Sequence, residues 1–148
     1  MCCALDVESF ALELVACLIR DPSRPAQTPR WVSRAKDFLE AFAQSPVRLR
    51  DVAAEVGVHP VYCARAFRRA TGCTVSAYVQ IQRLLHAGRL ILDEGRPLAD
   101  TAALAGFADQ SHFTRICSRA LGFTPGRLRR VRQALFAEPA GSDRSRND

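Results

Sequence analysis

The chain has 148 residues, enough for one domain with a sizeable core or for two small helical subdomains that share a connecting helix. Hydrophobic residues make up 48% and aromatic residues 7% of it, and the β-branched runs typical of strands are missing, so the composition predicts an all-α fold. No apolar stretch approaches the length of a membrane span, and no basic segment precedes the first apolar helix, which argues against a signal peptide. We therefore expect a cytoplasmic protein with no membrane partner.

The net charge of +6 is unevenly distributed along the chain. Residues 45–132 hold fourteen basic and six acidic side chains, an excess of +8, whereas residues 1–44 and 133–148 each carry a net charge of −1. A basic middle segment indicates a polyanionic partner such as nucleic acid. The alternative is a coding bias, since twenty of the 21 basic residues are arginine.

Six cysteines lie at positions 2, 3, 17, 63, 73 and 117, and none forms a C-x-x-C pair or accompanies a histidine cluster at zinc spacing. They indicate neither a structural metal nor a disulfide framework, and we expect no cofactor. Cys17, Cys63 and Cys117 occupy apolar helix positions and are interpreted as small core residues. The adjacent Cys2 and Cys3 are candidate reactive thiols.

The first part of the chain predicts a helix, a linker and a second helix. Asp6–Arg20 keeps apolar residues at a helical period, and Asp21–Pro29 contains three prolines among polar residues. We expect residues 1–29 to form this N-terminal helix and linker. Thr28 is the predicted N-cap of the next helix, with Pro29 as its first residue and an end near Ser45.

A helix-turn-helix pattern follows in residues 49–70. Leu49–Val56 predicts a short helix, Gly57 permits a tight turn, and Pro60 starts a second helix that runs to about Ala70. The inner side of the second helix would carry Cys63, Ala66, Phe67 and Ala70, and the outer side Val61, Ala64, Arg65 and Arg68.

A long connecting helix is predicted for Val75–Leu92, with Thr74 as its N-cap. Its inner side would carry Tyr78, Leu84, Ala87 and Ile91. Gly88 in its interior costs roughly 1 kcal/mol relative to Ala, which favours a close helix contact at that position. Such a helix would hold two recognition helices at a defined distance.

A second helix-turn-helix pattern lies in residues 98–122. Phe113, Ile116, Cys117 and Ala120 have the spacing of a buried helix stripe, so Ser111, Thr114, Arg115 and Ser118 would point to the opposite side. That outer side is short-chained, polar and basic, and it suits a DNA major groove. The alternative is an ordinary amphipathic helix with solvated arginines.

The two patterns are copies of each other. Leu49, Asp51, Ala53, Ala54 and Gly57 recur forty-nine residues later as Leu98, Asp100, Ala102, Ala103 and Gly106. After a turn that is one residue longer in the second copy, Arg65, Arg69, Ala70, Gly72 and Thr74 recur fifty residues later as Arg115, Arg119, Ala120, Gly122 and Thr124. The sequence therefore contains an internal repeat.

The most specific part of the second copy is GFADQSHFTR, from Gly106 to Arg115, followed by GFTP at residues 122–125. With these residues the chain resembles the DNA-binding domain of the AraC/XylS family of bacterial transcription regulators, over about residues 31–132. The resemblance implies a seven-helix, two-lobed domain whose two recognition helices enter successive major-groove segments on one face of DNA. We expect residues 30–133 to form this domain and residues 134–148 a disordered tail.

Two sets of residues are candidate DNA contacts. An arginine fork can donate two hydrogen bonds to guanine O6 and N7, so Arg65 and Arg115 are the first choices for base contacts; the alternative is that each pairs with a nearby carboxylate. The resemblance places the other groove-facing positions at Val61, Ala64, Gln110, Ser111 and Thr114. The arginines better placed for phosphates are Arg68, Arg69, Arg119, Arg129 and Arg130.

These patterns predict a sequence-specific transcription regulator that binds double-stranded DNA, with RNA polymerase as a further candidate partner. An enzyme is not expected, because the sequence contains no Cys/His pair, Gly-rich phosphate loop or paired-carboxylate motif. The alternative is a truncated family member that dimerises with, or antagonises, a full-length regulator through Asp6–Arg20.

Overall fold

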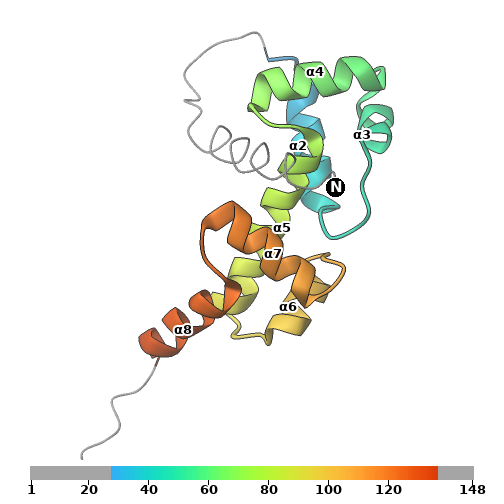
Figure 1. Cartoon of the computed structure of the whole chain (residues 1–148). Coiled ribbons are helices and arrows are strands. Elements are labelled where there is room, and N and C mark those ends of the chain that lie inside the picture. The colour runs from blue at the N-terminus through green and yellow to red at the C-terminus, as the bar shows by residue number, and fades with distance from the viewer. Residues whose placement is uncertain (1–27, 137–148) are drawn as a thin grey trace, which may run out of the picture.

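The computed structural model describes residues 28–136, which form helices and no strand. The predicted all-α fold is confirmed, and the helices follow one another along the chain as Figure 1 shows. Their bounds are Trp31–Ala41 for α2, Leu49–Val56 for α3, Pro60–Thr71 for α4, Val75–Leu92 for α5, Leu98–Leu104 for α6, Gln110–Leu121 for α7 and Pro125–Phe136 for α8.

Two expected segments fall wholly or mainly outside the described residues. The helix predicted for Asp6–Arg20 lies outside them, as does the expected tail from residue 137 onward. Helix α8 extends to Phe136, three residues into the segment expected as a tail. No helix within residues 28–136 combines the length and the apolar character needed to cross a membrane.

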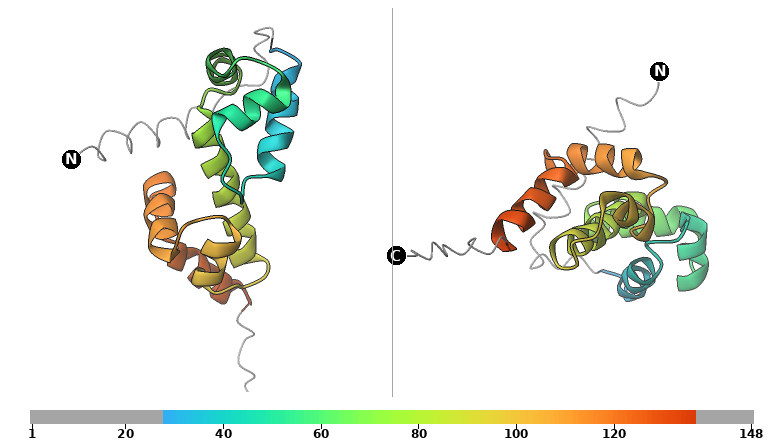
Figure 2. Two further views of the ribbon diagram at one scale, coloured as in Figure 1. Left: turned by 90° about the vertical axis from the view of Figure 1, so that its right-hand side faces the viewer. Right: turned by 90° about the horizontal axis from the view of Figure 1, so that it is seen from below.

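Helix α5 is shared by two lobes, with α2–α4 around one end and α6–α8 around the other (Figures 1 and 2). The first lobe consists of α2, α3, α4 and residues 75–81 of α5, whose buried side chains form one core. The second lobe consists of residues 84–92 of α5 with α6, α7 and α8, around a second core. Ala120 of α7 packs against both cores.

The connection between the two helices of each helix-turn-helix begins with the same glycine turn. Gly57 and Gly106 have φ angles of 72° and 82°, a left-handed conformation that strains any residue with a Cβ. The N–H of Val58 donates to the Ala53 carbonyl at 3.0 Å, and the N–H of Phe107 donates to the Ala102 carbonyl at 2.9 Å. The repeated Ala and Gly residues therefore build one turn twice.

The recognition helices α4 and α7 fill equivalent core positions with the same two residue types in opposite order. Cys63 and Phe67 of α4 correspond, fifty residues later, to Phe113 and Cys117 of α7, and all four side chains are at most 1% exposed. Phe67 packs edge-on against Tyr78 with ring centroids 5.5 Å apart. The prediction that Cys63 and Cys117 are core residues is confirmed, whereas Cys17 lies outside the described part of the chain.

Two arginine side chains donate hydrogen bonds to backbone carbonyls at or just beyond the end of another helix. The Arg83 Nε of α5 donates to the Ala43 carbonyl, just beyond α2, at 2.6 Å. The Arg132 Nε of α8 donates to the Leu92 carbonyl, at the end of α5, at 3.1 Å. Carbonyls at a helix end lack helical partners, and a guanidinium satisfies them.

Three sequence-based predictions were wrong in detail. Helix α2 has Arg30, and not Thr28, at its N-cap position, and the Arg30 side chain makes no capping hydrogen bond. The Pro29 carbonyl, just before it, accepts from the Val32 N–H at 2.9 Å. The helix ends at Ala41 and not near Ser45. Gly88 makes no close helix contact within residues 28–136, since a Cβ at this position would meet none of their atoms within 4 Å.

The other helix predictions are confirmed. The structure has the short helix at Leu49–Val56 and the connecting helix at Val75–Leu92, with the Thr74 hydroxyl oxygen accepting from the Ala77 N–H at 3.2 Å. The α4 helix begins at Pro60, behind His59, and ends one residue beyond the predicted Ala70.

Candidate nucleic-acid interface

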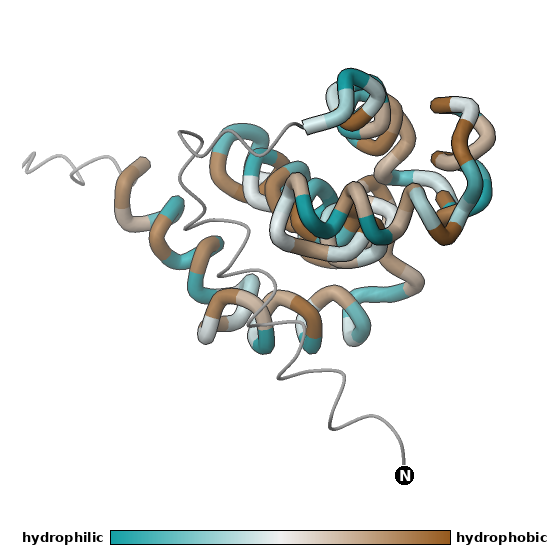
Figure 3. The backbone as a smooth tube through the Cα atoms, turned by 90° about the horizontal axis from the view of Figure 1, so that it is seen from above, coloured by the Kyte–Doolittle hydropathy of each residue, from teal (hydrophilic) through white to brown (hydrophobic). Residues whose placement is uncertain are grey.

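The outer sides of α4 and α7 carry the predicted base-contact residues. On α4, Val61 is 53% exposed, Arg65 is exposed and Ala64 is half-buried. On α7, Gln110, Ser111 and Arg115 are exposed and Thr114 is half-buried. In Figure 3 the tube alternates between hydrophilic and hydrophobic residues along its helices, as expected when each helix buries one side and leaves the other to solvent.

Residues at the N-cap positions start the recognition helices in different ways. The Asp109 Oδ1 accepts from the His112 N–H at 2.6 Å, whereas in the first lobe the His59 Nδ1 accepts from the Val61 N–H at 3.3 Å. His112 has a structural role, because its Nδ1 accepts from the Ala108 N–H at 3.4 Å and its ring lies against Phe107. Each turn is thereby joined to the helix that follows it.

Arg65 and Arg115 occupy equivalent positions fifty residues apart, one on each recognition helix. Within residues 28–136, neither forms a salt bridge or a side-chain hydrogen bond. The alternative that each is engaged by a nearby carboxylate therefore has no support among the described contacts. Both guanidiniums are exposed, as contact with base edges requires.

The predicted phosphate contacts are exposed arginines around the recognition helices. Arg68 and Arg69 lie in the last turn of α4, and Arg119 lies in the last turn of α7. Arg129 and Arg130 are exposed on α8, the helix that packs behind α7. Every predicted phosphate-contact residue is thus on a recognition helix or on the helix that follows it.

Not all of the positive charge of residues 45–132 is available to a polyanion. Burial lowers the pKa of Arg83, whose Nε and Nη2 donate to the carbonyls of Ala43 and Ser45. Arg132 is likewise half-buried and bonded to a carbonyl. The excess charge read from the sequence therefore overstates the charge that faces a ligand.

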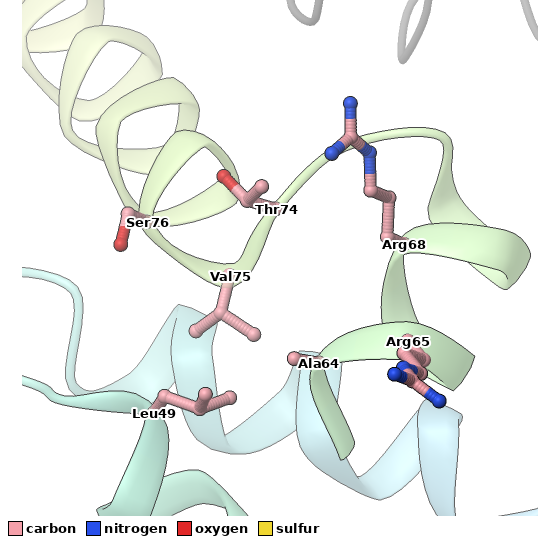
Figure 4. A pocket seen from close by; sticks show the side chains of 7 residues that line it. All are labelled: Leu49, Ala64, Arg65, Arg68, Thr74, Val75 and Ser76. Atoms are coloured by element: carbon pink, nitrogen blue, oxygen red, sulfur yellow. The ribbon is translucent and has the colours of Figure 1, made fainter. Parts of the chain in front are cut away.

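A cavity of about 320 Å³ opens beside the outer side of α4 (Figure 4). Apolar side chains from α3, α4 and α5 face one another in it, while arginines and hydroxyls stand around them. Its lining residues are Leu49, Ala64, Arg65, Arg68, Thr74, Val75 and Ser76. Of these, the sequence-based candidates included only Ala64, Arg65 and Arg68.

Thr74 and Ser76 are the polar residues that the sequence-based candidates missed. Both lie at the start of α5, where the unpaired N–H groups of a helix favour anions. The N-cap prediction for Thr74 was the signal that could have drawn attention to this place. Among the described residues, no group of three or more His, Cys, Asp or Glu side chains gathers in a way that could hold a metal ion.

Comparison with known proteins identifies the fold and its class. A family model described as a helix-turn-helix domain matches residues 52–131. The chain is 32% identical over 109 residues to the HTH-type transcriptional regulator ExsA of Pseudomonas aeruginosa, a match that covers 74% of this chain and 39% of ExsA. It is 30% identical over 83 residues to the probable transcription factor PqrA of Proteus vulgaris, covering 56% of this chain and 68% of PqrA.

Solved structures agree with these relatives. A probable AraC family transcriptional regulator from Rhodopseudomonas palustris has a TM-score of 0.62 at 25% identity, with 69% of this chain and 96% of that one covered. The DNA-binding domain of AdpA, solved in complex with a target DNA, has a TM-score of 0.66 at 20% identity, with 72% and 96% covered, and shows the fold alone. The chain therefore belongs to the AraC/XylS family and carries the DNA-binding domain of its transcription regulators.

Proposed function

We propose that this protein is a sequence-specific transcription regulator that inserts α4 and α7 into successive major-groove segments of one DNA duplex. The observation that carries the proposal is the duplication of one surface. Two recognition helices, built on the same turn, each present an exposed arginine at the same helix position, Arg65 and Arg115.

The proposed base contacts follow from the chemistry of the outer residues. The guanidiniums of Arg65 and Arg115 each donate two hydrogen bonds to the O6 and N7 of a guanine. The amide of Gln110 and the hydroxyls of Ser111 and Thr114 bond to neighbouring base edges. Val61 and Ala64 have only methyl groups to offer and contact thymine methyls.

The proposed phosphate contacts position the two helices on the duplex without reading its sequence. Arg68, Arg69 and Arg119 extend from the last turns of α4 and α7, and Arg129 and Arg130 extend from α8. Arg65, Arg68 and Ser76 line the cavity beside α4. Their guanidiniums and hydroxyl suit a DNA phosphate at the edge of the major groove that α4 enters. AdpA, which shares the fold, was solved in complex with a target DNA, and this supports DNA as the partner.

The second candidate function is interaction with a full-length regulator through Asp6–Arg20. The matched region spans 39% of ExsA and 31% of the regulatory protein PocR of Salmonella typhimurium, so both candidates concern this chain and not the whole length of those regulators. Size-exclusion chromatography with light scattering distinguishes it from binding of a monomer to DNA. RNA polymerase is the expected second partner of a DNA-bound regulator, to be tested by transcription in vitro on the selected site.

The test of the proposed function is selection of bound sequences from a random pool of duplex DNA. We expect one enriched site with two specified segments about one helical turn, 10–10.5 base pairs, apart. The double variant Arg65→Ala/Arg115→Ala is the matched control, because it keeps the fold and the phosphate contacts but removes both proposed base readers. A pool that shows no enrichment with the wild-type chain would remove the proposal.

A further inference from the structure

The two lobes meet at a short segment between α2 and α3, residues 43–45, which we call the junction segment. Arg83 holds this segment from α5, since its Nε donates to the Ala43 carbonyl at 2.6 Å and its Nη2 to the Ser45 carbonyl at 3.0 Å. Along α5, Arg83 lies between Ile81, which belongs to the first core, and Leu84, which belongs to the second. The arginine therefore anchors the segment at the boundary between the lobes.

The second lobe rests directly on the backbone of the junction segment. A Cβ at Gly106, in the turn before α7, would lie 2.5 Å from the Gln44 carbonyl oxygen and 2.8 Å from its Cα. These are backbone atoms, which cannot swing aside as the end of a flexible side chain can. Gly106 is therefore required both for its left-handed backbone and for the close approach of one lobe to the other.

The equivalent glycine of the first lobe makes no such contact. Gly57 has nearly the same φ, 72° against 82°, yet a Cβ there would meet no atom within 4 Å. Around these two glycines the turns have the same local structure, as their matching hydrogen bonds show. The contact at Gly106 is thus a property of how the lobes pack together, and not of the turn itself.

We propose that the junction segment, held by Arg83 and covered by Gly106, fixes the angle between α4 and α7 and thereby sets the half-site spacing that the protein accepts. The inference rests on the proposed function, in which both helices bind one duplex. One added base pair rotates the second half-site by about a tenth of a helical turn, so a fixed angle between the helices admits one spacing.

A second point of contact between the lobes is needed because α5 alone does not fix their angle. A long helix curves gently without breaking its hydrogen bonds, and lobes joined only by such a helix could tilt relative to each other. A backbone-to-backbone contact has no rotamers to adjust and transmits any displacement. The packing of Ala120 against both cores adds to the same connection.

The DNA test uses the selected half-sites on duplexes whose spacer is changed one base pair at a time. We expect the wild-type chain to lose roughly tenfold or more in affinity when the spacer changes by one base pair, because the second helix then meets the wrong base pairs. In Gly106→Ala we expect the preferred spacing to shift, or the affinities at neighbouring spacings to become equal. Gly57→Ala is the matched control, since it introduces the same backbone strain without the contact, and it should keep the wild-type spacing profile.

A second variant guards against a failure of Gly106→Ala to fold. Arg83→Gln removes the two hydrogen bonds to the junction segment without introducing a clash, and it should also broaden the spacing profile. Arg132→Gln is its control, because Arg132 makes the same type of bond, to the Leu92 carbonyl, within the second lobe. If Arg83→Gln and Arg132→Gln both broadened the spacing profile, the cause would be a general loss of rigidity and not the junction segment. That result would overturn the inference.

A measurement without DNA separates the inference from the proposed function. In the wild-type chain and in Gly57→Ala, the residual dipolar couplings of both lobes should fit a single alignment tensor, as expected for one rigid body. In Arg83→Gln, the two lobes should need two different alignment tensors. If the variants keep one alignment and the wild-type spacing profile, the inference is overturned while DNA binding stands. If the wild-type chain binds no DNA, the proposed function and the inference both fall.

Discussion

Arg65 and Arg83 illustrate how the same residue type takes different roles according to its surroundings. Arg83 is half-buried and donates to two backbone carbonyls, whereas Arg65 is exposed and makes no described side-chain bond within residues 28–136. An arginine that satisfies carbonyls contributes to the fold, and an exposed one on a recognition helix remains available to a base or a phosphate. Arg115 is exposed like Arg65, whereas Arg132 donates to a backbone carbonyl as Arg83 does.

Replacing Arg115 tests base reading at a single residue. Arg115→Ala should cost about 1–3 kcal/mol of binding free energy on the selected site and relax the preference at one position, because a bidentate guanine contact is lost. Arg130→Ala, on α8, should weaken binding to all sequences alike. Competition between the site and its single-base variants measures both effects. An unchanged base profile in Arg115→Ala would make α7 a phosphate clamp only.

The Cys117 thiol predicts a pH dependence of stability. Burial raises its pKa from 9.0 to about 11, and its Sγ donates to the Phe123 carbonyl at 3.5 Å. The unfolded chain loses the thiol proton at a lower pH than the folded chain, so this contribution to stability is complete below pH 9.0 and is lost as the pH rises toward about 11. Urea denaturation over this range should show a shallower fall for Cys117→Ala than for the wild-type chain. Parallel curves would contradict the prediction.

At the scale of single elements, the N-cap of α7 can be tested directly. Asp109→Ala removes the acceptor of the His112 N–H and should lower the free energy of unfolding by about 0.5–2 kcal/mol. Asp109→Asn keeps a side-chain acceptor and should retain most of the stability. Urea denaturation of both variants makes the comparison. Equal losses in both would show that the charge of Asp109 matters more than its capping hydrogen bond.

Helix α5 contains a glycine, Gly88, that packs against no other helix among the described residues. Since a Cβ at Gly88 would meet no atom within 4 Å, Gly88→Ala should raise the free energy of unfolding by about 0.4–1 kcal/mol through lower chain entropy in the unfolded state. An increased urea midpoint with an unchanged m-value is the expected result. Destabilisation would mean that another molecule or the N-terminal part of the chain packs against α5 at this position.

At the scale of the whole molecule, the basic charge should make DNA binding depend strongly on salt. Log K should fall linearly with log salt concentration, by about 0.9 for each phosphate that the protein neutralises, because bound counterions are released. Arg130→Ala should reduce this slope by about one unit, whereas Arg83→Gln should leave it unchanged, since Arg83 is already bonded within the fold. A salt titration by fluorescence anisotropy measures the slopes. If log K did not change with salt concentration, the interpretation of this chain as a DNA-binding protein would be contradicted.

Much of the local structure could be predicted because it depends on short stretches of sequence. The bounds of α3 and α5 and the start of α4 follow from helical periodicity, from Thr74 as an N-cap and from Pro60 at a first helical position. The internal repeat identified two equivalent turns, and the structure builds both with matching hydrogen bonds. The inner and outer sides of α4 and α7 were likewise predicted, since the 3.6-residue period alone separates them.

The sequence by itself therefore determined the helices, the duplicated turn and the residues that face outward, all of which arise from interactions between near neighbours in the chain. Only the tertiary structure decided which glycine makes a close contact and which arginines remain available. Gly106 and Gln44 are 62 positions apart, and the bonds from Arg83 to the Ala43 carbonyl and from Arg132 to the Leu92 carbonyl each span 40 residues. Such contacts depend on how whole lobes pack, and no local period or cap encodes them.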